Sequence, residues 1–172
     1  MKQLMQKSLL GMLCLTLLLS LSSCSTLTPK ADYAALAQAG LRLHLDIDAK
    51  DNHPLYLEAA RWIGVPYRPG GMTRKGTDCS GLSTQLYKRV YRITLPHSSQ
   101  SQKDQARHRI ARSKLQEGDL VFFGNGRSKK RVTHVGVYLK KGKFIHASNR
   151  GVVVSSLDEP YYRKCWIGGG RY

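Results

Sequence analysis

The 172 residues are enough for one domain with a hydrophobic core plus a leader or tail, and a hydrophobic content of 41% is that of a globular protein. The formal net charge of +17 favours a polyanionic partner such as nucleic acid, anionic lipid or an acidic cell-wall polymer, unless it serves only solubility. The sequence contains no recognition-helix pattern, zinc-ligand spacing or RNA-binding aromatic motif, so we expect no nucleic-acid partner.

The N-terminus predicts a lipoprotein signal peptide over residues 1–23. Two lysines precede an apolar run of 13 residues, 9–21, which is too short to span a bilayer comfortably. The run ends in Leu-Ser-Ser-Cys, which resembles a bacterial lipoprotein signal with Cys24 as the lipid attachment site. Ser25 favours sorting to the outer membrane, facing the periplasm. An ordinary secretory signal or membrane anchor with an incidental cysteine is the alternative.

Residues 24–53 are predicted to form a lipid-anchored tether and arm. Residues 25–40 indicate a short tether followed by two helical turns. Residues 40–51 alternate apolar and polar side chains, which predicts a half-buried strand or extended arm with His44 on its exposed face. The remaining residues, 54–172, are expected to form the functional domain.

The first half of this domain has helical patterns. A helix is expected at about 54–63, ended by a glycine and a proline. A second helix begins at Cys79 within the segment GTDCSGL, because Leu82, Leu86 and Val90 recur at helical spacing and Asp78 is a favoured capping residue. The polar stretch after Leu-Pro-His carries a capping signature and predicts a further helix.

The second half has strand patterns. A turn is expected at 116–119, and four apolar segments then follow in hairpin style, at 120–123, 132–139, 143–148 and 152–154. Helices followed by an antiparallel sheet indicate an α+β fold.

Cys79 is the candidate nucleophile. A thiol in the first turn of a helix lies near unpaired backbone N–H groups and the positive end of the helix dipole, and both favour the thiolate. Alternatively, Cys79 is simply a small buried apolar residue. Once the leader and Cys24 are set aside, only Cys165 remains as a partner for a disulfide, and its position beside Trp166 favours packing.

Two histidines are predicted to lie on one face of a hairpin. A three-residue loop, Lys140–Gly142, with glycine in the left-handed conformation, places Leu139 opposite Lys143. His134 and His146 then become diagonal neighbours on one side of the sheet, and Gly136 between them leaves room for something to pack closely, such as the Cys79 helix. A register shift of one residue would separate the two histidines.

A cysteine and two histidines fit a nucleophile, a base and an orienting residue. A zinc site with Cys79, His134 and His146 as ligands is the alternative. Because no carboxylate that would support such ligands is evident nearby, we expect no metal.

The segments GTDCSGL, GDLVFF, THVGVYL and FIHAS, in this order, resemble the NlpC family of bacterial cell-wall cysteine peptidases over about residues 54–165. The resemblance implies a papain-like α+β fold, in which N-terminal helices, including the nucleophile helix, pack on a central antiparallel sheet. It implies hydrolysis of the γ-D-glutamyl–diaminoacid bond of peptidoglycan stem peptides through a thioester, with meso-diaminopimelate or lysine as the diaminoacid and no cofactor.

The same resemblance assigns roles to individual residues. Cys79 becomes the nucleophile, His134 the general base and acid, and His146 the third polar member. Tyr67 stands near the oxyanion unless it is only a packed turn residue. Two neighbours of the nucleophile complete the set: Ser80 to hold substrate and supply an oxyanion N–H, and Asp78 to pair with a free amine of the substrate, although capping alone explains Asp78.

Two features depart from the family pattern. His97 replaces the usual arginine after Leu-Pro, and the basic segment 127–131 lies close to His134 in sequence. Ser98, Ser99 and Gln102 fall near the expected cleft and are interpreted as structural.

Two other functions stay open. One is an amidase or acyltransferase on the same fold, and the other is a non-catalytic wall-binding lipoprotein that uses its basic surface. The expected partners are peptidoglycan stem peptides and the membrane through the N-terminal lipid, and the sequence identifies no regulatory protein.

Overall fold

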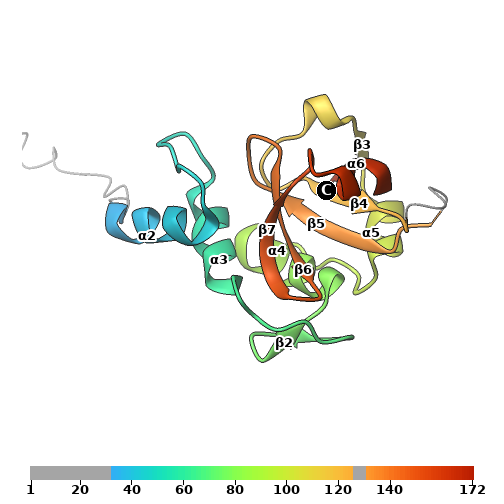
Figure 1. The fold of residues 1–172 in the computed structure, drawn as a ribbon, viewed down its shortest axis with the longest axis horizontal. Coiled ribbons are helices and arrows are strands. Elements are labelled where there is room, and N and C mark those ends of the chain that lie inside the picture. Colours follow the sequence, from blue (N-terminus) through green and yellow to red (C-terminus); the bar gives the residue numbers. More distant parts are fainter. Residues whose placement is uncertain (1–31, 126–130) are drawn as a thin grey trace, which may run out of the picture. The chain divides into compact units, whose positions relative to one another are not determined.

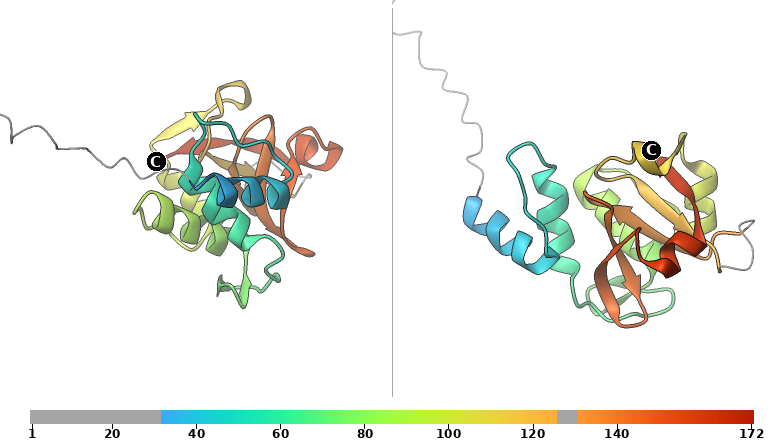
Figure 2. Two further views of the ribbon diagram at one scale, coloured as in Figure 1. Left: turned by 90° about the vertical axis from the view of Figure 1, so that its left-hand side faces the viewer. Right: turned by 45° about the horizontal axis from the view of Figure 1, so that its top comes forward.

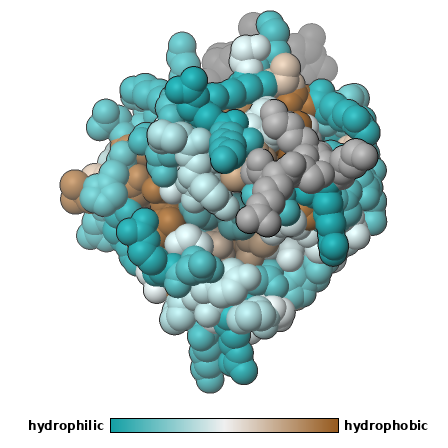
Figure 3. All heavy atoms as spheres, turned by 45° about the vertical axis from the view of Figure 1, so that its right-hand side comes forward, coloured by the Kyte–Doolittle hydropathy of each residue, from teal (hydrophilic) through white to brown (hydrophobic). Residues whose placement is uncertain are grey.

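The computed structural model describes residues 32–125 and 131–172. The predicted leader 1–23, the lipid site Cys24 and most of the basic segment 127–131 therefore lie outside the described residues. Among the described helices, none has the length and hydropathy needed to cross a membrane. On the face shown in Figure 3, most side chains are hydrophilic, as the net charge of +17 leads one to expect.

A six-stranded sheet with the order β3-β8-β4-β5-β6-β7 is the centre of the unit Tyr33–Tyr172 (Figure 1). Each strand pairs antiparallel with its neighbours. The strands are β3 (His108–Ile110), β4 (Leu120–Phe123), β5 (His134–Tyr138), β6 (Lys143–Ser148), β7 (Gly151–Ser156) and β8 (Trp166–Arg171). A separate small hairpin is formed by β1 (Met72–Thr73) and β2 (Gly76–Thr77).

The helices are concentrated in the first half of this unit (Figure 2). They are α2 (Tyr33–Leu43), α3 (His53–Trp62), α4 (Cys79–Val90), α5 (Ser99–Gln105) and, late in the chain, α6 (Pro160–Cys165), with a short 3-10 helix at Arg112–Lys114. Helices α2 and α3 pack side by side, and α4 packs on β5 and β6. A helical half followed by an antiparallel sheet confirms the predicted α+β class.

The sheet has a different hydrophobic cluster on each face. The larger cluster includes Leu82 and Leu86 of α4 together with Val135, Val137 and Ile145 of the sheet. The smaller cluster, on the opposite face, joins the side chains of Val121, Phe123, Phe144, Leu157 and Cys165. Because side chains alternate along a strand, neighbouring residues of β5 face different clusters. This alternation decides where the histidines lie.

Residues 40–51 do not form the predicted strand, although the extended-arm alternative holds after the helix, where Leu45 and Ile47 are partly buried while Asp46 and Asp48 are exposed. Helix α2 continues to Leu43, and the chain then turns at His44, which has a positive φ of 52° and is exposed as predicted. The buried side chains of α2 recur at helical spacing: Leu36, Ala39 and Leu43. Leu41, which the alternating pattern would bury, is 77% exposed. Packing of an amphipathic helix against α3 therefore outweighed the short alternating pattern.

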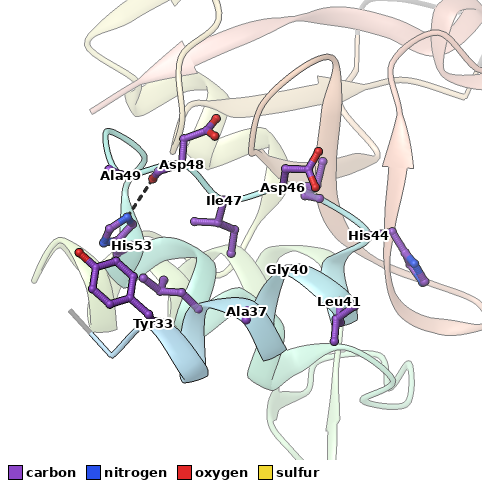
Figure 4. A pocket seen from close by; sticks show the side chains of 12 residues that line it. Tyr33, Ala37, Gly40, Leu41, His44, Asp46, Ile47, Asp48, Ala49 and His53 are labelled. Carbon is purple, nitrogen blue, oxygen red and sulfur yellow. Dashed lines mark hydrogen bonds between the residues drawn. The ribbon is translucent and has the colours of Figure 1, made fainter.

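The loop after α2 is held by polar contacts. A ring nitrogen of His53 lies 2.9 Å from the carbonyl oxygen of Asp48, at the side of a hollow of about 580 Å³ between α2 and this loop (Figure 4). The ammonium of Lys140, in the β5–β6 loop, pairs with Asp48 at 2.7 Å and also with Asp51. These ion pairs attach the N-terminal arm to the sheet.

The other predicted elements are largely confirmed. Helix α3 begins one residue earlier than expected, with Asn52 as its cap. Strands β4 and β6 have the predicted ends, and β5 and β7 lie within two residues of theirs. The polar stretch after Pro96 forms α5 with Ser98 as its cap. Strands β1, β2, β3 and β8 and helix α6 were not predicted.

Candidate active site

Asp78 fixes the beginning of α4. Its Oδ1 accepts a hydrogen bond of 2.7 Å from the backbone N–H of Gly81, which confirms the predicted cap. The preceding loop approaches so closely that a Cβ atom at Gly81 would lie 2.1 Å from the carbonyl oxygen of Gly71. A glycine is therefore required here, and the loop places Cys79 at the first position of the helix.

Cys79 is 9% exposed and belongs to the larger hydrophobic cluster. Burial raises the pKa of its thiol, although backbone N–H groups of Val135 and Ser80 oppose that effect. For the thiol by itself, the loss of hydration outweighs the nearby N–H groups that were predicted to favour the thiolate. A thiolate must be produced by transferring the proton to a base.

The predicted hairpin register is confirmed. Val137 pairs with Ile145 and Tyr138 with Phe144, and the N–H of Leu139 donates to the carbonyl oxygen of Lys143 at 2.9 Å. Gly142 has the predicted left-handed conformation, with a φ of 74°. This register places the two histidines on the same face of the sheet.

The two histidines form a hydrogen-bonded pair. Nε2 of His134 lies 2.9 Å from Nδ1 of His146, and the two rings are perpendicular. His146 is 1% exposed, whereas His134 is only partly buried. Because Nε2 of His134 is engaged, Nδ1 is the ring nitrogen left to exchange a proton with a thiol.

Gly136 leaves room for close packing as predicted, but the group that packs there is the Phe144 ring and not the Cys79 helix. A Cβ atom there would lie 2.6 Å from Cδ2 of Phe144, so the space beside Gly136 holds the Phe144 ring. Helix α4 packs on the other face of the sheet, where Val135 points. Cys79 meets the histidine pair at the beginning of β5, because the N–H that reaches its sulfur belongs to Val135, next to His134. Among the hydrogen bonds of residues 32–125 and 131–172, none joins Cys79 directly to His134.

Two hydroxyl groups hold the far side of His146. Its Nε2 lies 3.1 Å from Oγ of Ser155 on β7 and 3.1 Å from the hydroxyl of Tyr162 on α6. A base at Nδ1 of His134 requires a proton on its Nε2, which donates to Nδ1 of His146. His146 then carries its own proton on Nε2 and donates to these hydroxyls. The sequence pattern did not indicate Ser155 or Tyr162.

Both histidines are neutral at pH 7. Burial lowers the pKa of His134 to about 4, and burial together with the neighbouring His134 lowers the pKa of His146 to about 3. A neutral His134 can accept a proton, so the resting pair is a thiol and a neutral imidazole.

The buried His146 should make stability fall in acid. Its pKa is about 3 in the folded protein and about 6.5 in the unfolded chain, so the unfolded chain binds the extra proton between these values. Stability is therefore lost as the pH falls below about 6.5, and His146 accounts for about 3 kcal/mol of the loss between pH 7 and pH 4. In His146→Gln, denaturant unfolding at the two pH values should differ by about 3 kcal/mol less than in the wild type.

Ser155→Ala is the matched control for that measurement. It removes one hydrogen bond from the same ring but leaves the ring able to titrate. It should lower stability by about 1 kcal/mol at both pH values and keep the wild-type difference between them. An unchanged pH dependence in His146→Gln would show that the ring does not titrate as described.

The carboxylate of Asp78 already has several donors. Besides Gly81, it accepts from the hydroxyl of Ser80 at 3.0 Å and from the N–H of Gly70 at 2.9 Å, and Nε2 of His97 lies 3.0 Å and 3.1 Å from its two oxygens. Burial alone would raise the pKa of this carboxyl, but these donors lower it. The residue that departs from the family pattern, His97, is thus the partner of Asp78. The substrate-binding roles predicted for Asp78 and Ser80 stay predictions.

Tyr67 lies beside Cys79 and the histidine pair. It is 39% exposed and lines a cavity of about 410 Å³ together with His134 and His146. Burial raises the pKa of its phenol, and the nearby Cys79 and Asp78 raise it further. The structure therefore brings Tyr67 beside Cys79 and the histidines, as the resemblance implies, while its catalytic role stays a prediction.

Gln102 has the environment of a structural residue. Its side chain is fully buried, accepts from the hydroxyl of Ser83 at 2.8 Å, and donates to the carbonyl oxygens of Ser80 and Pro96 at 3.1 Å and 2.8 Å. These bonds attach α5 to the first turn of α4. The amide thereby supports the segment that carries Cys79.

The described residues contain neither a disulfide nor a cluster of metal ligands. Cys79 and Cys165 are both unbridged, and Cys165 is 2% exposed in the smaller cluster, which agrees with a packing role. Within the ranges that the structure describes, no three His, Cys, Asp or Glu side chains are grouped so that they could hold a metal ion.

Comparison with known proteins agrees with this geometry. The sequence model of the NlpC/P60 family matches residues 64–171. The chain is 42% identical to a "Probable endopeptidase" of Haemophilus influenzae over 106 residues, which cover 61% of this chain and 65% of that protein. It is also 42% identical, over 106 residues, to the "Murein DD-endopeptidase MepS/Murein LD-carboxypeptidase" of Escherichia coli K12. That match covers 61% of this chain and 54% of the relative, so the similarity spans only about half to two thirds of these proteins.

A solved structure gives the same result for the fold. The crystal structure of an NlpC/P60 family protein from Bacillus cereus is similar with a TM-score of 0.62 and 34% identity, over 74% of this chain and 42% of that one. The predicted papain-like arrangement, with helices on an antiparallel sheet, is therefore confirmed.

Proposed function

The chain belongs to the NlpC/P60 family, and on that premise we propose that it is a peptidoglycan hydrolase, a cysteine endopeptidase that cleaves the γ-D-glutamyl–diaminoacid bond of stem peptides. The relatives named as endopeptidases, one of them of murein, support the class of reaction. The relatives do not support the choice of bond, since the Escherichia coli relative is named as a DD-endopeptidase and an LD-carboxypeptidase.

The hydrogen-bonded pair of His134 and His146 beside Cys79 is the observation that carries this proposal. Nε2 of His134 lies 2.9 Å from Nδ1 of His146, and the sulfur of Cys79 accepts the backbone N–H of Val135, the residue after His134. An orienting residue, a base and a nucleophile in this order form the arrangement that acyl transfer requires. A non-catalytic wall-binding protein has no need of it.

The proposed reaction proceeds through a thioester. Cys79 gives its proton to Nδ1 of His134, and the sulfur attacks the γ-carbonyl of D-glutamate, while N–H groups of Cys79 and Ser80 stabilise the oxyanion. His134 then gives the proton to the leaving amine as the C–N bond breaks. Water attacks the thioester after losing a proton to His134, and the acid product and the free thiol form. His146 holds the imidazole throughout.

Binding of substrate would complete this geometry. The sulfur in the free protein accepts a backbone N–H and is not bonded to His134. Catalytic hydrogen bonds are often incomplete until substrate binds. We therefore infer that the thiol turns toward Nδ1 of His134 when the cleft is occupied.

We further propose that Cys24 carries a lipid and that residues 24–53 connect it to the catalytic domain at the outer membrane, facing the periplasm. The signal-like sequence of residues 1–23 supports this location. Such an anchor would hold the enzyme close to peptidoglycan without a wall-binding repeat.

Digestion of purified muropeptides by residues 25–172, followed by mass spectrometry, tests the proposed function. We expect products cut between D-glutamate and the diaminoacid. Cleavage at a D-alanyl bond would support a peptidoglycan hydrolase but would show that the proposed scissile bond is wrong. Intact muropeptides that remain bound to the protein would instead favour the wall-binding alternative.

A further inference from the structure

The cavity beside the histidine pair has an unusual balance of charge. It measures about 410 Å³, and its walls come from the beginning of β5, the β6–β7 turn, α6 and Tyr67. No aspartate or glutamate within residues 32–125 and 131–172 lines it. His134 and His146 are neutral at pH 7, since burial lowers the pKa of each. Among the described residues, Arg150 therefore supplies the only formal charge of this cavity.

The turn that presents Arg150 is fixed. Oγ of Ser148 accepts from the N–H of Arg150 at 3.1 Å and donates to the carbonyl oxygen of Gly151 at 2.9 Å. Gly151 has a φ of 98°, and a Cβ atom there would lie 2.8 Å from the carbonyl oxygen of Val65. The turn is thus held against the segment before Tyr67, and its position does not depend on the Arg150 side chain.

The guanidinium of Arg150 has no carboxylate partner among the described residues. It is exposed, and it lies near Tyr162, because its charge opposes the rise in the pKa of that phenol caused by burial. An arginine held at a cavity wall without a partner offers a planar pair of donors that matches a carboxylate.

The cavity lies on the leaving-group side of the proposed reaction. His134 must reach the leaving amine to protonate it, and His134 lines the cavity. Of the residues predicted to hold the acyl part or its oxyanion, Cys79, Asp78 and Ser80 do not line the cavity, and Tyr67, which lines it, lies near Cys79. The leaving residue should therefore occupy this cavity.

We propose that Arg150 binds a free carboxylate of the leaving residue, so that the enzyme prefers stem peptides whose diaminoacid carries an ionised side-chain carboxylate. This inference rests on the proposed function. Diaminopimelate has such a group, while its amide and lysine do not. A bidentate, charge-assisted contact would account for a preference of about 10-fold or more.

The test compares kcat/KM for two peptides that differ only in this group, L-Ala-γ-D-Glu-diaminopimelate with its side-chain carboxylate free or amidated. The wild type should favour the acid by about 10-fold or more, and Arg150→Gln should bring the ratio close to one. Arg163→Gln removes the same charge from an exposed residue of α6 outside the cavity, and should keep the wild-type ratio. Equal ratios in the wild type and Arg150→Gln would overturn the proposal.

A binding measurement separates this proposal from the proposed function. Cys79→Ala and the double variant Cys79→Ala with Arg150→Gln are titrated with both peptides by NMR. Tighter binding of the acid to the first variant, lost in the second, supports Arg150 even if the wild type cuts a different bond. Equal binding of acid and amide to Cys79→Ala overturns the role of Arg150, whereas wild-type enzyme that cleaves neither peptide overturns the proposed bond.

Discussion

Cys79→Ala should lower kcat for muropeptide cleavage by roughly 10⁴-fold or more, because no other group can form the thioester. The substitution removes one sulfur atom from a buried position in the larger cluster, so we expect a loss of only about 1 kcal/mol in the free energy of unfolding. Mass spectrometry of the digest measures the first effect, and denaturant unfolding measures the second.

Cys165→Ala is the matched control for this prediction. Cys165 is the other cysteine of the described residues, is equally unbridged, and belongs to the smaller cluster as the last residue of α6. Its removal creates a similar small cavity but should change kcat by less than about threefold. Cleavage that persists in Cys79→Ala, or an equal loss of kcat in both variants, would contradict the assignment of Cys79.

The hairpin of the two histidines was predictable because local chemistry determines its register. Gly142 can adopt the left-handed conformation that the short loop requires, and the loop then fixes which residues of β5 and β6 face each other. The position of His134 beside His146 follows from counting residue pairs outward from this loop. The approach of Cys79 to the beginning of β5 does not, because it depends on which face α4 covers.

The N-terminal arm shows where such patterns fail. Residues 41–47 alternate in hydrophobicity, yet Leu43 is buried as part of α2 while Leu41 is exposed. Over a stretch as short as one helical turn, the same sequence of apolar and polar residues fits both a strand and an amphipathic helix. Contact with α3, which the local sequence does not specify, decided between them.

The elements missed near the C-terminus have weak local signals. Strand β8 contains three consecutive glycines, Gly168–Gly170, and glycine has a low intrinsic preference for strands. A Cβ atom at Gly170 would lie 2.8 Å from Ala106 and 2.9 Å from Phe122, so close packing between β4 and α5 requires glycine there. Ser155 and Tyr162 were missed for a related reason, since only the folded chain brings β7 and α6 to His146.

The reactivity of Cys79 was the other point that sequence could not settle. The helix N-terminus was identified correctly, and its N–H groups do lower the pKa of the thiol. The opposing effect is burial, which depends on the strands packed over the sulfur. The effect of the helix N-terminus on the thiol is therefore present but opposed by burial, and the proposed mechanism relies on His134 to take the proton.

His134→Gln should lower kcat by about 10³-fold or more, whereas His146→Gln should lower it by about 10- to 100-fold. His134 exchanges the proton with both the thiol and the leaving amine, and glutamine cannot accept a proton. At position 146, the side-chain oxygen of glutamine can still accept the hydrogen bond from Nε2 of His134, which keeps the base oriented. Single-turnover cleavage of a purified stem peptide measures kcat apart from product release.

The pH dependence separates these two roles further. In the wild type, protonation of His134 should reduce kcat/KM only as the pH falls toward about 4, since burial lowers its pKa to about that value. In the wild type, His146 can also be protonated in acid, whereas in His146→Gln the loss of activity in acid should follow the single protonation of His134. Equal losses of kcat in the two variants would contradict the assignment of proton transfer to His134 and of orientation to His146. An acid limb centred near pH 6.5 would show that substrate or solvent reaches the ring and removes the effect of burial.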